Sequence, residues 1–152
     1  MYERILVPLD GSEEAERVLP HIIALAQKFE SSVYLVRATA ARSQVHAESR
    51  TPHAPEVGLD IAQRRLDSEA AAAQRYLSDV VGRLSAEGIQ AHADVADGPP
   101  PAAILEQAGE HDCSLIAMTT HGRGGVGRLV YGSVADAVLQ RSTIPVLLVR
   151  LA

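Results

Sequence analysis

Residues 118–134 read MTTHGRGGVGRLVYGSV, a glycine-rich stretch between a predicted strand and a predicted helix. The apolar run at 114–118 is typical of a buried strand, and residues 133–140 have helical spacing. The glycines between them are Gly122, Gly124, Gly125, Gly127 and Gly132. The N–H groups of such a loop and the dipole of the following helix both favour negative charge. The stretch therefore predicts a phosphate site, which we interpret as part of a nucleotide site.

Two common phosphate motifs match this loop by letters but not by context. Gly122, Gly124 and Gly127 have the spacing of the dinucleotide fingerprint, which should open a helix directly and be followed by an acidic residue about twenty positions later. A Walker A loop needs Lys and then Ser or Thr, where this chain has Arg128 and Leu129. We exclude both motifs.

Strand-like and helix-like patterns alternate along the whole chain. The predicted strands lie at 5–9, 32–38, 89–96, 114–118 and 144–149. The predicted helices lie at 12–29, 59–87, 102–108 and 133–141, and Ser12 is the expected N-cap of the first. This alternation predicts one α/β domain over residues 1–152, a doubly wound, Rossmann-like parallel sheet with helices on both faces. Residues 39–58 show no periodicity and are predicted to form a flexible surface loop.

Composition narrows the class of protein. The 152 residues contain no apolar run of membrane-spanning length and no signal-peptide pattern, so we expect a cytoplasmic protein with no membrane partner. A net charge of -5 and the absence of Trp argue against a nucleic-acid partner. The single Cys113 excludes an internal disulfide and is expected to be a buried small hydrophobe. The six histidines lack metal-ligand spacing, so no metal site is expected.

The glycine spacing resembles the ATP-binding signature of the universal stress protein family: Gly, two residues, Gly, nine residues, then Gly-Ser or Gly-Thr. Here Gly122 is followed by nine residues and then by Gly132 and Ser133. Residues 4–12 (RILVPLDGS) and 144–150 (IPVLLVR) resemble the opening and closing strands of the family. The resemblance implies an adenine nucleotide alpha hydrolase-like sheet of order 3-2-1-4-5. The first and fourth strands would then meet at the topological switch point, where such sheets bind ligands.

The family resemblance also implies a function, a homodimeric module that binds ATP, with or without Mg²⁺, or no cofactor at all, in the stress response. Backbone groups of Gly122 and Gly132 and the hydroxyl of Ser133 would contact phosphate. Asp10 would lie near the adenosine. The remaining contacts implied by the resemblance would come from Pro8, Leu9, Ala38, Met118, Thr119 and Val134.

Each of these residues also has an ordinary structural interpretation. Ser133 begins a sequence like a capping box, which would cap the last helix without a ligand. Asp10 is also suited to be a turn or cap residue. Leu9 and Met118 could simply be core.

Thr119 occupies the place of the family's first motif glycine. A β-branched residue takes positive φ only with strain, and its side chain fills space that glycine would leave. This departure supports an alternative, a nucleotide-free dimeric interaction protein in stress signalling.

The predicted strand from Ile144 to Val149 is apolar on both faces and would lie at a sheet edge. An exposed apolar edge must be covered, and the resemblance implies a homodimer through this strand. The sequence shows no nucleophile–base pair and no paired catalytic carboxylates, so we expect no enzyme beyond slow ATP hydrolysis. A third interpretation is an enzyme on a related fold, adenylate-forming or electron-transfer-flavoprotein-like, for which no second substrate domain is seen.

Overall fold

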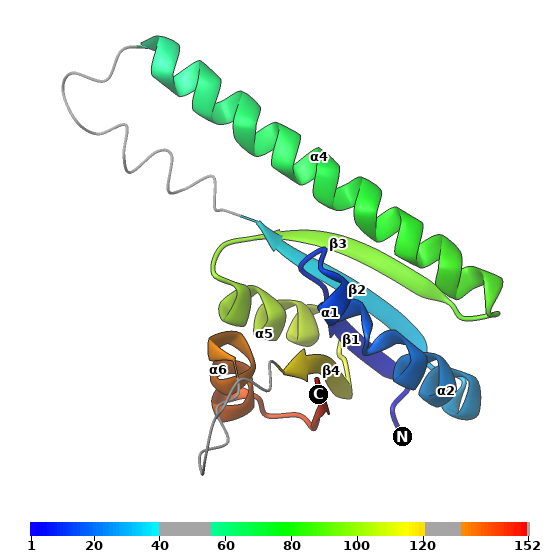
Figure 1. Ribbon diagram of the computed structural model, residues 1–152. Helices are drawn as coiled ribbons and strands as arrows, with labels where there is room; N and C mark the ends of the chain where they lie inside the picture. Colours follow the sequence, from blue (N-terminus) through cyan, green and yellow to red (C-terminus); the bar gives the residue numbers. More distant parts are fainter. Residues whose placement is uncertain (40–55, 121–131, 152) are drawn as a thin grey trace.

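The fold is an α/β sandwich built on one parallel sheet (Figure 1). A computed structural model describes residues 1–39, 56–120 and 132–151. The strands are β1 (Arg4–Pro8), β2 (Ser32–Thr39), β3 (Ala91–Asp97), β4 (Leu115–Thr120) and β5 (Val146–Arg150). The helices are α1 (Glu13–Glu16), α2 (Leu19–Phe29), α4 (Glu56–Ala86), α5 (Pro100–Glu110) and α6 (Ser133–Arg141). The sheet order β3-β2-β1-β4-β5 confirms the predicted doubly wound fold.

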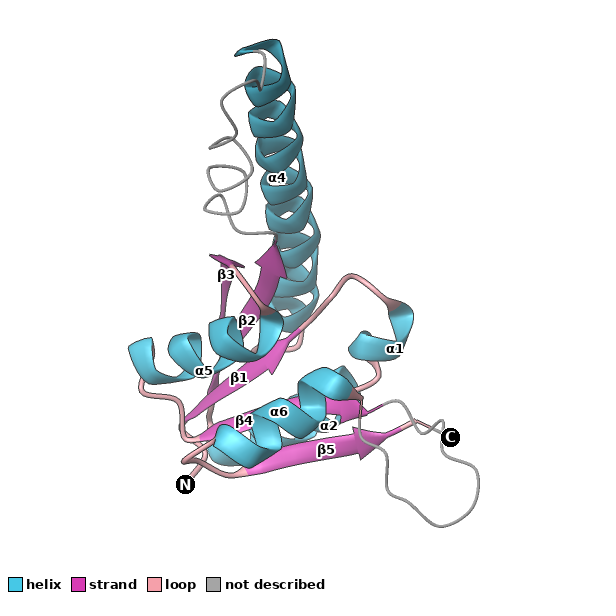
Figure 2. Ribbon diagram, turned by 90° about the vertical axis from the view of Figure 1, so that its left-hand side faces the viewer, coloured by secondary structure: helices cyan, strands magenta, loops and turns pink. Residues whose placement is uncertain are grey.

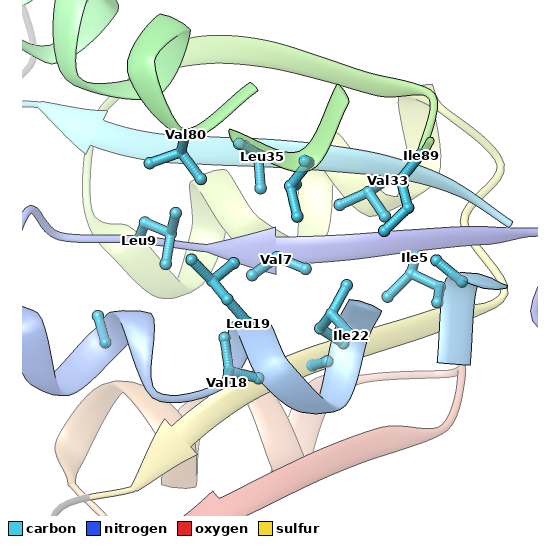
Figure 3. Packing of buried hydrophobic residues seen from close by; sticks show 14 of the residues in the cluster. Ile5, Val7, Leu9, Val18, Leu19, Ile22, Val33, Leu35, Val80 and Ile89 are labelled. Atoms are coloured by element: carbon cyan, nitrogen blue, oxygen red, sulfur yellow. The ribbon is translucent and has the colours of Figure 1, made fainter. Parts of the chain in front are cut away.

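Helices cover both faces of the sheet, and each face has its own core. The first core joins β1 and β2 to α2 and α4, and Figure 3 shows their side chains pointing toward one another. Ile5, Val7, Ile22 and Leu77 are fully buried there. The second core joins the other side of the strands to α5 and α6. Leu6, Ile116 and Val138 are buried in it. Burial on both faces explains why the central strands β1 and β4 read as continuous apolar runs.

The predicted helix over residues 12–29 is wrong as a single element, because it is divided. α1 ends at Glu16 and α2 begins at Leu19, with the buried Val18 as its N-cap. Pro20 lies in the first turn of α2. Proline lacks an N–H, so it is tolerated in the first turn of a helix but not in a helix interior. The chain therefore begins a new helix at Leu19 and does not continue α1 through Pro20.

Helix α4 is much longer than the sheet that it covers. Its 31 residues correspond to about 46 Å at the usual helical rise. Among the side chains that the structure describes, the buried ones lie in the second half, and the first half extends past the sheet (Figures 1 and 2). These buried side chains are Ala73, Leu77, Val80 and Leu84. The helix begins at Glu56, inside the stretch predicted as a loop, and residues 40–55 lie outside the described part of the chain.

Candidate functional site

The switch point of the sheet lies between β1 and β4, which are neighbours but separate toward their carboxyl ends. Both strands belong wholly to the described part, and their last pair is Leu6 with Ile116. Beyond it, β1 continues beside β2 to Pro8, and β4 continues beside β5 to Thr120. Proteins with doubly wound sheets bind ligands at such a switch point, just beyond the carboxyl ends of the strands. The turn after β1 and the start of α6 are therefore the parts of the candidate site that the structure describes.

The turn after β1 is held by the side chain of Asp10. Its Oδ1 accepts hydrogen bonds from the Ser12 amide at 2.9 Å and from the Ser12 hydroxyl at 2.5 Å. The hydroxyl oxygen in turn accepts the Ala15 amide at 3.1 Å and so caps α1, as predicted for Ser12. Gly11, with φ +88°, has a conformation that side chains rarely adopt. Asp10 thus has the turn role that the sequence offered as one interpretation, and its contact with adenosine stays a prediction.

The start of α6 is different, because no side chain of the described residues caps it. Its N-cap is Gly132, with φ −55° and ψ 152°, and Ser133 is the first helical residue and is exposed. The predicted capping role of Ser133 is therefore wrong, since a residue inside the helix cannot have the extended backbone that a cap needs. Asp136 accepts a hydrogen bond from Gln140 at 2.8 Å.

The other predicted contact residues divide between the two cores. Leu9 is buried in the core on the α2 side, and Met118 in the core on the α5 side. Pro8 and Ala38 are half-buried at the carboxyl ends of β1 and β2, and Val134 is half-buried on α6. Leu9 and Met118 therefore have the ordinary core role. A nucleotide role for any of the five stays a prediction.

Thr119 fits its strand without strain. It pairs with Val149 in β4 and β5, and the non-glycine residues with positive φ in the described part lie elsewhere. Because β4 extends to Thr120, Thr119 has extended backbone and does not take the positive φ that would strain a β-branched residue. The half-buried side chain remains present where the family has glycine. Gly122, the second motif glycine, lies outside the described residues.

A polar network that sequence reasoning missed lies beside the turn after β1. The Arg37 guanidinium is 5.4 Å from the centre of the Tyr76 ring. The Tyr76 hydroxyl donates to Glu16 at 3.0 Å, and Arg83 donates to the same carboxylate at 2.6 Å. Burial, followed by the hydrogen bond to Glu16, raises the pKa of Tyr76. Its spacing in α4 indicated only an apolar face, so no sequence signal identified this contact.

Cys113 is buried next to β4, as predicted. Burial raises the pKa of its thiol to about 11, so the nucleophilic thiolate is disfavoured at neutral pH. In the parts of the chain that the structure describes, no three His, Cys, Asp or Glu side chains gather where they could hold a metal ion. None of the described helices is long and apolar enough to cross a membrane.

The parallel sheet, with a helix that begins after Gly132 at the switch point, places the chain in the class of doubly wound α/β folds. The sequence model of the universal stress protein family matches residues 1–150, and this chain belongs to that family. A Bacillus subtilis universal stress protein is 29% identical over 99% of this chain and 100% of the relative. A Methanocaldococcus jannaschii relative is 28% identical over 99% of this chain and 83% of its own length.

Solved structures share the fold over almost the whole chain. A Methanocaldococcus jannaschii protein superposes with TM-score 0.75 at 25% identity, over 100% of this chain and 98% of its own. A universal stress protein solved in complex with cAMP has TM-score 0.67 at 22% identity, over 99% and 98% of the two chains. The Archaeoglobus fulgidus protein in complex with dAMP has TM-score 0.68 at 24% identity, over 97% of each chain. At the two lower identities the likeness shows the shared fold.

Proposed function

We propose that this chain is a homodimeric adenine-nucleotide-binding module of the cytoplasmic stress response, with ATP as its ligand. The observation that carries the proposal is the start of α6 at the switch point, which no described side chain caps. Gly132 and Ser133 lie there. The first N–H groups of a helix lack partners inside it, and together with the helix dipole they favour an anion.

The residues present fit a phosphate group at this position. A methyl group built on Gly132 would meet no described atom within 4 Å, so none of the described residues would block a ligand from this backbone. The hydroxyl of Ser133 is exposed beside it and can donate to phosphate. The first turn also carries Asp136, whose negative charge opposes a phosphate. A Mg²⁺ ion carried by the nucleotide would offset that repulsion.

The identity of the base rests on the family and on the ligands of solved structures. Two proteins of this fold hold cAMP and dAMP, which share adenine and a phosphate. In our proposal Asp10, Pro8 and Ala38 contact the adenosine half, at the carboxyl ends of the strands that carry them. Thr119 and Val134 would lie between that half and the phosphates.

Calorimetric titration with ATP and Mg²⁺ tests the proposal, after the preparation has been checked for co-purified nucleotide. We expect binding with a dissociation constant on the order of micromolar, about 8 kcal/mol. AMP and adenosine titrations then separate the adenosine contribution from that of the phosphates. Absence of both heat and co-purified nucleotide would favour the second candidate, a nucleotide-free interaction protein, for which Thr119 is the supporting feature.

The dimer in this proposal forms through β5. This strand lies at the sheet edge, and its residues Val146–Val149 are only half-buried in the single chain. Sedimentation equilibrium should therefore give twice the mass of the chain. Hydrogen exchange of the β5 amides that face away from β4 should quicken on dilution. A monomer at all concentrations would remove this part of the proposal.

A binding role without dedicated catalysis completes the proposal. The hydroxyl of Ser12 is paired with Asp10, but it also accepts the Ala15 amide and so serves as a cap. We expect phosphate release from ATP to be slow, well below one turnover per second. Faster release that survives removal of contaminating ATPases would show an enzyme.

A further inference from the structure

The turn after β1 lies directly against an arginine of the neighbouring strand. A methyl group built on Gly11 would lie 3.1 Å from Nη1, 3.3 Å from Cζ and 3.4 Å from Nη2 of Arg37. Because these three distances are similar, the flat face of the guanidinium is turned toward Gly11. The positive φ of Gly11 favours glycine, and a side chain there would also press on the Arg37 guanidinium. The Arg37 side chain therefore forms one wall of the turn.

Arg37 also contacts an aromatic side chain of α4. Its guanidinium lies within cation–π range of Tyr76, at 5.4 Å from the ring centre. Tyr76 is fixed by its hydrogen bond to Glu16 of α1, and Glu16 is also bonded to Arg83 of α4. A continuous set of contacts thus runs from α4, through Arg37 of β2, to the backbone at Gly11. It connects the long helix to the turn that carries Asp10.

The electrostatics of this network are consistent with the geometry. A planar guanidinium is suited to lie over an aromatic ring, as that of Arg37 does over Tyr76. The negative charge of Asp10 is among the influences that raise the pKa of Tyr76, after burial and Glu16. The Asp10 carboxylate is therefore close enough to Tyr76 to act on it. Arg37 lies in the same group of side chains, against both Tyr76 and the turn.

We propose that Arg37 is a positioning residue for nucleotide binding, because its guanidinium fixes the turn from Asp10 to Ser12 at the switch point. This inference rests on the proposed function and adds a residue to it. A turn held in one conformation loses less freedom when a ligand binds, which raises affinity. Arg37 itself does not contact the ligand, and it acts through the turn.

Substitution of Arg37 by Met tests the role, since Met keeps an unbranched apolar stem against Tyr76 and removes the planar cation. Affinities for adenosine, AMP and ATP with Mg²⁺ are compared by calorimetry. We expect a loss of about tenfold for all three ligands, because the turn contacts the adenosine half that they share. A loss confined to AMP and ATP would mean that Arg37 binds phosphate directly and would overturn the proposal. Unchanged affinity for all three would overturn it as well.

A double-mutant cycle separates positioning from a general loss of structure. If Arg37 acts through Asp10, the substitution Arg37→Met should cost much less affinity in an Asp10→Asn background than in the native protein. Equal losses in both backgrounds would contradict the proposal. Arg75→Met is the matched control, because Arg75 is an exposed arginine of α4 next to Tyr76 in the sequence, and its substitution should leave affinity unchanged.

Hydrogen exchange gives a test that needs no nucleotide. The Ser12 amide donates to Asp10, so its exchange rate reports how firmly the turn is held. Arg37→Met should speed this exchange about tenfold, and Arg75→Met should not. If the native protein binds no adenine ligand yet Ser12 exchange depends on Arg37, the proposed function fails while the action of Arg37 on the turn stands. If exchange at Ser12 is unchanged, the inference fails whatever the affinities show.

Discussion

Two helices, α1 and α6, begin near the switch point, and they differ in whether a described side chain caps the first turn. At α1, the Ser12 hydroxyl accepts the Ala15 amide, and Asp10 holds that hydroxyl in place. At α6, the corresponding position is Gly132, and no described side chain takes the role. Among the described residues, the chain therefore caps one helix start with its own side chains and leaves the other without a side-chain cap. A helix start indicates an anion site only where no side chain already binds its free N–H groups.

The largest expected effect comes from adding a side chain at the start of α6. Gly132→Val should lower ATP affinity about a hundredfold, roughly 2.7 kcal/mol, by placing methyl groups where the phosphate approaches. The fold should survive, since φ at Gly132 is negative and a Cβ there meets no described atom. Calorimetry and urea unfolding measure the two quantities. Gly109→Val is the control, because Gly109 has similar open space in α5, away from the switch point.

Removal of the exposed hydroxyl next to Gly132 should have a smaller effect on binding alone. Ser133→Ala should lower the affinity for ATP about tenfold, since a hydrogen bond to a charged group contributes roughly 1.5–3 kcal/mol. The free energy of unfolding should change by less than about 0.5 kcal/mol, because this hydroxyl caps nothing. A clear loss of stability without loss of ATP affinity would mean that the Ser133 hydroxyl stabilises α6, as the Ser12 hydroxyl stabilises α1, and does not bind the ligand.

The same substitution at the other helix start should act mainly on stability. Ser12→Ala removes the cap of α1 and the hydroxyl bonded to Asp10, so we expect a loss of about 1 kcal/mol in urea unfolding. ATP affinity should fall by less than in Ser133→Ala. If Ser12→Ala instead costs more affinity than stability, α1 belongs to the binding surface.

The smallest effect is expected at Thr119. Because its backbone is already extended in β4, Thr119→Gly relieves no strain and should destabilise the fold by about 0.5–1 kcal/mol. ATP affinity should change by less than about threefold. A gain of tenfold or more, measured by calorimetry, would show that the threonine side chain obstructs the site.

Most of the fold could be predicted from the sequence, because burial on both faces gives the central strands β1 and β4 continuous apolar runs. The order of the strands came from the family resemblance, and the sheet confirms it. Element ends were harder to predict. β5 begins at Val146 rather than Ile144, after Pro145, and the break between α1 and α2 depends on Pro20 lying in a first turn.

The candidate site was less predictable than the fold, for two physical reasons. A cap depends on which residue has extended backbone, and a shift of one position turned Ser133 from the expected cap into the first helical residue. The network of Arg37, Tyr76 and Glu16 joins three elements far apart in sequence. Local spacing carries no information on such contacts, and Tyr76 reads as one more apolar position of its helix.

The central place of β1 has a consequence for how the chain acquires its structure. Arg4 and Ser114 are 110 residues apart and are joined across the pair β1–β4. Contacts between residues so distant in sequence must wait until most of the chain is available, and they slow folding. During synthesis, one edge of β1 therefore stays without its partner until β4 has left the ribosome. Until then the amino-terminal part of the chain exposes an apolar strand edge that favours aggregation.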